Sequence, residues 1–239
     1  MIHNVDCIDY LRQQPAGSFD CVLTDPPYSS GGLHRGDRMK KTSTKYQSSN
    51  AQDIKPEFFG DTRDQRSLEK WCTEWMRECW RVTKDGGFIF CFIDWRNLAV
   101  MIDAIQMAGY VYRGVFPWIK PNTRPQKGTF QQNTEFVVYG TRGAVIQQEK
   151  YARGFWQQMP LPTPKRIHST EKPVELLEHL LQFTPEGGRV FDPFAGSGST
   201  GEACARLGLE FEGCELSEEY TAAANARLEA VSKQGQLAV

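Results

Sequence analysis

The chain has 239 residues, with 28 Lys and Arg against 29 Asp and Glu, so its formal net charge at pH 7 is −1. An apolar share of 40% together with 21 glycines suffices for a sizeable core and excludes a disordered chain. The apolar run from Gly86 to Ile93 has eight residues, far below the ~20 needed to span a bilayer, which excludes a transmembrane segment.

The N-terminal third predicts a strand, a long loop and a helix. Phe19 to Leu23 is an apolar run that stops at two prolines, Pro26 and Pro27, as a buried strand would. Residues 29–66 show little periodicity, and we expect a mobile loop there, because loops of that length are usually functional or disordered. One face of a helix is predicted by the spacing of Trp71, Trp75, Met76, Cys79 and Trp80.

The middle of the chain predicts three more strands. Phe88 to Ile93 follows a Gly-Gly turn, and Asp94 is placed to cap a helix that ends before Gly109. Tyr110 to Ile119 and Glu135 to Tyr139 follow as strands. The remaining residues up to Arg166 are polar and punctuated by prolines, which indicates loops or a small lobe.

The C-terminal third alternates helices and strands. Pro173 stands at the start of an amphipathic helix, where its missing N–H costs nothing. Further elements are predicted at 189–192 (strand), 199–207 (helix), 210–215 (strand) and 217–231 (helix). The alternation favours an α/β fold with a doubly wound, mainly parallel sheet.

The charge is unevenly distributed along this neutral chain. Residues 34–45 carry five basic side chains against Asp37 alone, and residues 111–131 carry four basic side chains and no acid. Each stretch could neutralise a few phosphates, and the alternative is an ordinary solvated loop.

The termini and the cysteines bear on location and redox state. Met1 to Asp6 lack the basic and apolar segments of a secretory signal, so we expect a cytoplasmic protein. Seven cysteines without a C-x-x-C pair and four scattered histidines indicate neither a disulfide framework nor a metal site. Reduced thiols in the core are the better interpretation.

A glycine turn follows the predicted strand at 189–192. Gly196, Gly198 and Gly201 match G-x-G-x-x-G, and Glu215 ends the next strand, 17 residues after Gly198. Such glycines let the backbone approach a bound nucleotide, and an acid at the following strand end can bind ribose hydroxyls, so the pattern indicates a nucleoside cofactor. Only 24 residues follow Glu215, so the other strands must come from the N-terminal half and the sheet is permuted.

A second motif, Asp25-Pro26-Pro27-Tyr28, comes directly after a strand. A carboxylate and an aromatic ring at a strand's carboxyl end lie where open α/β sheets bind ligands. A strand-terminating turn with a surface tyrosine is the plainer alternative.

Together the two motifs resemble the S-adenosylmethionine-dependent DNA amino-methyltransferases, which methylate adenine N6 or cytosine N4. Asp-Pro-Pro-Tyr is that family's catalytic signature, and Phe194-Ala195-Gly196-Ser197-Gly198 matches its cofactor signature. The catalytic motif comes first, as in the permuted β class. The resemblance implies one methyltransferase domain over 1–239, a seven-stranded sheet, and a target-recognition region inserted at 120–166.

The resemblance also implies roles for individual residues. Asp25, Pro26, Pro27 and Tyr28 are the catalytic residues, with Tyr28 stacking on a base flipped out of double-stranded DNA. S-adenosylmethionine would bind, without a metal, to Asp6, Cys7, Thr170, Lys172, Asp192, Phe194, Ala195, Gly196, Ser197, Gly198 and Glu215. DNA contacts are expected from Arg35, Arg38, Lys40, Lys41, Arg113, Lys120, Arg124, Lys127, Gln131 and Asn133.

We therefore expect an adenine-N6 DNA methyltransferase of the restriction-modification type. Cytosine-N4 methylation uses the same geometry, although Asp rather than Ser at the start of the motif favours adenine. A catalytically idle DNA-binding protein and a nicotinamide oxidoreductase are the alternatives from other classes. An RNA substrate and a homodimer remain open. C5-cytosine chemistry needs a thiolate nucleophile and is disfavoured, because no Pro-Cys pair follows a strand.

Overall fold

The computed structural model describes residues 1–28, 63–121, 123, 125, 127–160 and 171–236. The loop expected at 29–66 lies outside these ranges, apart from its last four residues. Of those four, Gln65 and Arg66 already belong to a helix.

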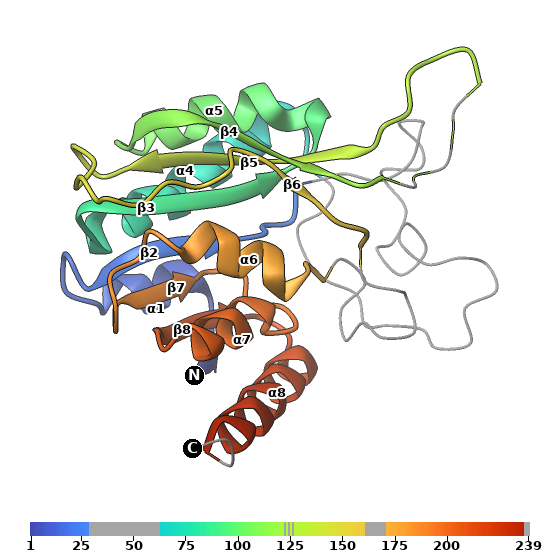
Figure 1. Cartoon of the computed structure of the whole chain (residues 1–239). Helices are drawn as coiled ribbons and strands as arrows, with labels where there is room; N and C mark the ends of the chain where they lie inside the picture. The colour runs from blue at the N-terminus through green and yellow to red at the C-terminus, as the bar shows by residue number, and fades with distance from the viewer. Residues whose placement is uncertain (29–62, 122, 124, 126, 161–170, 237–239) are drawn as a thin grey trace.

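Eight strands form one sheet in the order β1-β8-β7-β2-β3-β5-β4-β6 (Figure 1). The strands are β1 (Ile2–Asn4), β2 (Phe19–Thr24), β3 (Thr83–Ile93), β4 (Val111–Ile119), β5 (Thr134–Thr141), β6 (Trp156–Gln157), β7 (Arg189–Asp192) and β8 (Glu210–Glu215). Only β5 among them runs antiparallel to its neighbours. The predicted mainly parallel sheet is confirmed, but it has eight strands rather than seven, because the two-residue β6 pairs with the end of β4.

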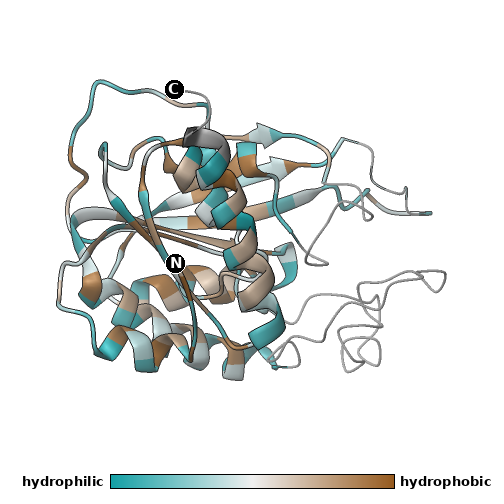
Figure 2. Ribbon diagram, turned by 90° about the horizontal axis from the view of Figure 1, so that it is seen from below, coloured by the Kyte–Doolittle hydropathy of each residue, from teal (hydrophilic) through white to brown (hydrophobic). Residues whose placement is uncertain are grey.

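Helices cover both faces of the sheet, as predicted for a doubly wound fold. They are α1 (Cys7–Arg12), α4 (Gln65–Val82), α5 (Leu98–Met107), α6 (Val174–Leu181), α7 (Ser199–Arg206) and α8 (Glu218–Gln236). The core beneath α1, α4 and α5 includes Val22, whereas Cys21 and Leu23 face the core beneath α6 and α7. This alternation along β2 follows from the two-residue period of a strand. The central strands are accordingly hydrophobic along most of their length in Figure 2.

The helix starts follow from local side-chain capping. Asp64 accepts the backbone N–H groups of Arg66 and Ser67, each at 3.0 Å, and so begins α4. Asp94 caps a short 3₁₀ turn, Trp95–Asn97, that leads into α5, close to the helix start that the sequence predicts. Pro173 is the N-cap residue of α6 rather than its first helical residue. Within the described ranges, no helix combines the length and the apolarity needed to cross a bilayer.

The central pair of parallel strands, β2 and β7, positions the site. Val22 of β2 lies in register with Phe191 of β7. From the carboxyl end of β2 the chain continues to β3 on one side, and from β7 it continues to β8 on the other. Connections that diverge in this way leave a crevice at the carboxyl ends of the two strands, where open α/β sheets bind their ligands.

Candidate active site

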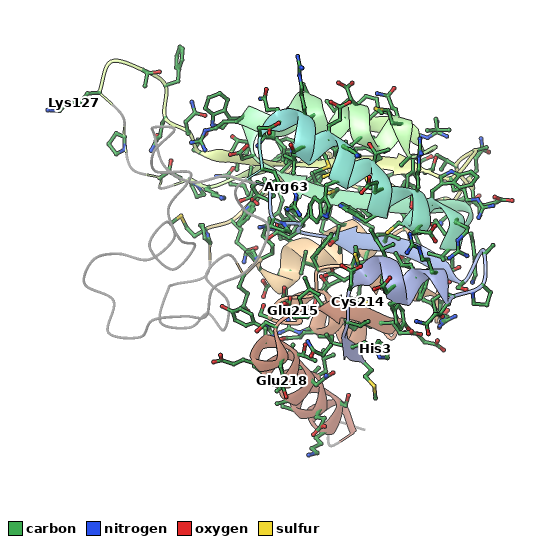
Figure 3. The ribbon with its side chains drawn as sticks, turned by 180° about the vertical axis from the view of Figure 1, so that it is seen from behind. His3, Arg63, Lys127, Cys214, Glu215 and Glu218 are labelled. Atoms are coloured by element: carbon green, nitrogen blue, oxygen red, sulfur yellow. The ribbon has the colours of Figure 1, made fainter. Side chains whose placement is uncertain are left out.

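A cavity of about 210 Å³ opens at this crevice. Most of its wall comes from the segments that follow β1, β2, β7 and β8, and the rest from α4, β3 and the start of α6 with the residues just before it. The lining includes Asp6, Cys7, Asp25, Pro26, Pro27, Tyr28, Lys172, Asp192, Phe194, Ala195, Gly196, Ser197 and Glu215. Three of the residues that line the cavity, Arg63, Cys214 and Glu215, are labelled in Figure 3. The catalytic motif and the glycine turn therefore face one cavity.

The glycine turn needs its glycines for backbone conformation and for close approach. Gly196 and Gly198 have φ values of 49° and 76°, in the left-handed region that strains other residues. A Cβ on Gly198 would lie 3.1 Å from the Cβ of Ala224. The turn is anchored to β8 because the amide of Ala195 donates to the carbonyl of Cys214 at 2.9 Å.

Asp192 connects the two motifs directly. Its Oδ1 accepts the hydroxyl of Thr24, at the end of β2, and its Oδ2 accepts the hydroxyl of Thr200 in α7, each at 2.7 Å. The amide of Phe194 also donates to Oδ1, at 3.0 Å. Burial raises the pKa of Asp192 to about 6, against the opposing effect of these hydrogen bonds. The sequence analysis expected Asp192 to bind the cofactor. In the structure Asp192 lines the cavity, and its hydrogen bonds hold β2, β7 and α7 together.

Glu215 and Asp6 present carboxylates on the opposite side of the turn. Glu215 accepts the amide of Ser217 at 2.9 Å through Oε1 and the amide of Gly196 at 3.1 Å through Oε2, while burial raises its pKa. Asp6 caps α1 by accepting the amide of Ile8 at 2.8 Å. The adjoining Cys7 thiol is buried, which raises its pKa to about 12 and makes it unsuited to act as a nucleophile.

An aromatic wall that the sequence interpretation missed closes another side of the cavity. The ring of Phe194 lies 5.3 Å from that of Trp71 and 5.1 Å from that of Trp75, the latter edge-on. The guanidinium of Arg63 lies 4.0 Å from the centre of the Trp71 ring. Both tryptophans belong to the predicted helical face, but Trp71 lines the cavity and Trp75 is buried in the core behind it, a difference that the spacing alone could not show.

Asp25 lies at the centre of the site with one oxygen bound and one open. Its Oδ2 accepts Lys172 Nζ at 2.5 Å, although 147 residues separate the two. Its Oδ1 is buried and has no hydrogen-bond partner among the residues that the structure describes. A buried acceptor left in this way is costly unless a ligand completes it. Burial raises the pKa of Asp25 to about 6, with Lys172 lowering it and Glu135 adding to the rise.

Lys172 itself is nearly inaccessible, with 5% of its surface exposed. The sequence analysis assigned it to the cofactor, with Thr170, but the structure places its ammonium between Asp25 and Glu135, 2.9 Å from Glu135 Oε1. Burial would raise the pKa of Glu135, yet Lys172 and Lys120 outweigh it and lower that pKa to about 2. Glu135 was missed, although an acid that opens an otherwise apolar strand was a signal. Thr170 lies outside the described residues.

Tyr28 and the two prolines complete the catalytic motif. The phenol of Tyr28 donates to Glu135 Oε1 at 3.2 Å, and its carbonyl accepts Asn97 Nδ2 at 2.8 Å. Pro26 and Pro27 line the cavity beside it. The ring is thus held at the cavity wall by contacts at its phenol and its backbone.

The residues expected to contact DNA do not form one group. Lys127 is exposed on the long β4–β5 connection, which projects from the sheet (Figure 3). On the same connection, Gln131 Nε2 donates to the carbonyl of Thr123, and the carbonyl of Asn133 accepts the amide of Lys120. Lys120 Nζ binds Glu135 at 2.6 Å. Arg35, Arg38, Lys40, Lys41 and Arg124 lie outside the described residues.

Arg113 is separated from all of these. It lies near the start of β4, where its guanidinium donates to Thr141 Oγ1 at 2.9 Å and to the carbonyl of Gly143 at 3.0 Å. Arg113 lies at an irregularity of β4 between Tyr112 and Gly114, which are level with Ile89 and Phe90 of β3 through their β5 partners. These contacts tie Arg113 to β5 and to the segment that follows it, near the start of β4, whereas Lys120 follows the end of that strand, and a contact of Arg113 with DNA stays a prediction. Among the described residues, no group of three metal-ligating side chains is present.

Comparisons with known proteins agree with this geometry. A profile described as DNA methylase, of the N6/N4 type, matches residues 19–226. The Escherichia coli (strain K12) protein YubD, named a methylase, is 30% identical over 239 aligned residues, covering 97% of this chain and 91% of its own. The type II methyltransferase M.HinfI of Haemophilus influenzae is 26% identical, covering 93% of this chain and 66% of its own.

Solved structures share the fold. The complex of M1.HpyAVI with S-adenosylmethionine superposes with a TM-score of 0.68 at 23% identity, covering 95% of this chain and 98% of that one. The cytosine-N4-specific PvuII DNA methyltransferase superposes with a TM-score of 0.71 at 15% identity, covering 98% and 91%. The fold, the convergent motifs and the profile match over most of the chain lead to one conclusion: this chain belongs to the N6/N4 DNA methylase family.

Proposed function

We propose that this chain transfers a methyl group from S-adenosylmethionine to the N6 amine of adenine in DNA. The observation that carries the proposal is the buried Oδ1 of Asp25, which has no hydrogen-bond partner among the described residues and belongs to a residue that lines the cavity shared with the glycine turn. A carboxylate oxygen accepts hydrogen bonds and suits an amine donor. Asp rather than Ser at position 25 favours adenine over cytosine as the source of that amine.

The residues of the cavity fit the donor. Gly196 and Gly198 leave the backbone of the turn open, as close approach of a nucleoside requires. Each carboxylate oxygen of Glu215 accepts one backbone amide and keeps acceptor capacity for a ribose hydroxyl. Asp6, at the start of α1, is placed for the adenine amine of the donor, and Phe194 for contact with its ring. When bound, S-adenosylmethionine supplies an electrophilic methyl group on its sulfonium sulfur.

The chain's own groups act on the acceptor amine. An exocyclic amine is a poor nucleophile because its lone pair is delocalised into the base. Asp25 Oδ1 accepts one N–H and the carbonyl of Pro26 accepts the other, which draws the nitrogen towards tetrahedral geometry and directs its lone pair into the cavity. Methylation leaves a positive charge on this nitrogen, and the carboxylate of Asp25 stabilises that charge until the proton leaves.

A base within a duplex cannot reach this recessed carboxylate, so the target must be flipped out of the helix. Tyr28 lies beside Asp25 and offers the ring on which the flipped base stacks. The exposed β4–β5 connection, with Lys127 and Gln131, supplies the phosphate and base contacts of the target-recognition region.

The decisive experiment is a mass-spectrometric digest of duplex DNA treated with the protein and S-adenosylmethionine. We expect N6-methyladenine. N4-methylcytosine without N6-methyladenine would refute the adenine assignment, and methylation of RNA in preference to DNA would refute the choice of nucleic acid. Isothermal titration with S-adenosylhomocysteine and with NAD tests the donor separately, since binding of NAD alone would contradict it.

A further inference from the structure

Four charged side chains from four segments form a continuous row that starts in the cavity wall, at Asp25 and Lys172, and continues behind it. Lys120, directly after β4, binds Glu135 Oε2 at 2.6 Å, and Glu135 Oε1 binds Lys172 at 2.9 Å. Lys172 in turn binds Asp25 Oδ2 at 2.5 Å. The row alternates two ammonium groups with two carboxylates, so its formal charges cancel.

Glu135 is bound by three neighbouring side chains. Besides the two ammonium groups it accepts the phenol of Tyr28 at 3.2 Å. Its side chain is 11% exposed and is not part of the cavity lining, so it lies behind the groups expected to meet the base. Glu135 therefore reaches the reaction through Lys172 and Tyr28 rather than by touching a substrate.

Without Glu135, the ammonium of Lys172 would be free to centre on Asp25. Lys172 has three N–H donors, and its ammonium lies 4.9 Å from the centre of the Phe92 ring and between the two carboxylates. A second carboxylate on its far side holds it at Oδ2 and away from Oδ1. The oxygen that the amine needs is then left open.

From this geometry we infer that Glu135 is a positioning residue for methyl transfer, which fixes Lys172 on one oxygen of Asp25 and holds the phenol of Tyr28. This rests on the proposed function, since it assumes that Asp25 receives the target amine. The row also fixes the ionisation of Asp25. The charged groups that act on it are Lys172, Glu135 and Lys120, with Asp192 behind it in β7.

The test compares Glu135→Gln with Glu135→Asp. Glutamine keeps the shape and loses the charge, so kcat falls roughly 10- to 100-fold through misplacement of Asp25 and Tyr28. The KM for S-adenosylmethionine stays unchanged, because Glu135 does not line the cavity. The acidic limb of the pH profile of kcat moves to lower pH by roughly one unit, because a negatively charged neighbour of Asp25 has been removed. Aspartate keeps the charge but is too short to span both lysines, so kcat falls while the limb stays in place.

Asp20→Asn is the matched control. The side chain of Asp20 is also 11% exposed, and it binds the ammonium of Lys84 at 2.8 Å. Asp20 lies near the amino end of β2, whereas Asp25 follows the carboxyl end of that strand. We expect Asp20→Asn to show any loss of fold stability that comes from removing a buried charge. Its kcat and the acidic limb of its pH profile should stay unchanged. Thermal unfolding and titration with S-adenosylhomocysteine confirm that each variant is folded.

Two results would overturn the inference: a kcat of Glu135→Gln within twofold of the unsubstituted protein, or an acidic limb that does not move. Failure of the proposed function is distinct, because the unsubstituted protein would then transfer no tritiated methyl group to DNA. If Glu135→Gln fails to fold, Glu135→Asp still decides, since an undiminished kcat in that variant contradicts the positioning role.

Discussion

The amide of Gly196 donates to Oε2 of Glu215 at 3.1 Å, so the glycine turn and the end of the next strand hold each other in place. Glu215 also accepts the amide of Ser217. The carboxylate therefore has a fixed orientation before any ligand arrives, which lowers the entropic cost of binding.

Replacing Glu215 by alanine is expected to weaken binding of S-adenosylhomocysteine by roughly 10- to 100-fold, the loss of about one hydrogen bond to a charged group. Isothermal titration measures it. Glu218→Ala is the control, because Glu218 is exposed in the first turn of α8 only three residues away (Figure 3). Equal affinities of the two variants would remove Glu215 from the binding site.

Activity should fall as the pH drops through about 6. Burial raises the pKa of Asp25 to about 6, so below that pH the carboxyl is protonated in the folded protein and loses acceptor capacity for the amine. Single-turnover rates between pH 5 and pH 8 give the profile. Asp192 has a similar pKa, but it already accepts three hydrogen bonds from the protein. The rate of Asp192→Asn should therefore still fall as the pH drops through about 6. A profile that is flat from pH 5 to pH 8 would contradict the role of Asp25.

Much of the fold was predictable from local pattern. The ranges of β7 and β8 agree residue for residue with the prediction, because each is a short segment with apolar residues that begins one or two residues after a glycine. The meeting of the two motifs at adjacent strand ends was also predicted, and the hydrogen bond from Thr24 to Asp192 confirms it. By contrast, β1, α1 and β6 have three, six and two residues, too few to show a period.

The contacts of the site were less predictable. Lys172 precedes a proline at a helix start, where a solvated side chain is common, and nothing local indicates an aspartate 147 residues away. Arg113 lies near the start of β4 and Lys120 directly follows its end, so they are seven residues of extended chain apart, at about 3.3 Å per residue. Proximity in sequence suggested one basic patch, but an extended strand separates its members.

That separation gives a prediction for DNA binding. Lys127→Gln should weaken binding about equally for all DNA sequences and lower the slope of log K against log salt by ~0.9, the value for one phosphate contact. Arg113→Gln should leave the affinity for DNA and the salt slope unchanged, because the guanidinium of Arg113 is bound to Thr141 and Gly143. Fluorescence anisotropy at several salt concentrations distinguishes the two. A loss of affinity in Arg113→Gln alone would reverse this assignment.

Removal of Asp25 should nearly abolish activity and leave the fold intact, whereas removal of Lys172 should lower the stability of the fold. In Asp25→Ala, Lys172 keeps Glu135 as a partner, so the protein stays folded and still binds S-adenosylhomocysteine. Its methyl transfer should fall roughly 10²- to 10⁴-fold, since the acceptor of the amine is lost. A fully active Asp25→Ala would remove the proposed role of this carboxylate.

In Lys172→Met, two carboxylates are left without the ammonium between them, and about 3–5 kcal/mol of the free energy of unfolding should be lost. Lys172 lowers the pKa of Asp25, so its removal raises that pKa further above the unfolded value. The folded state then binds more protons than the unfolded state in this range, and the stability of the variant rises as the pH falls. Urea unfolding at pH 5.5 and at pH 7.5 measures this, with Lys84→Met, which removes the partner of Asp20, as the control. A variant as stable as the unsubstituted protein at both pH values would mean that the row of charges does not hold the site together.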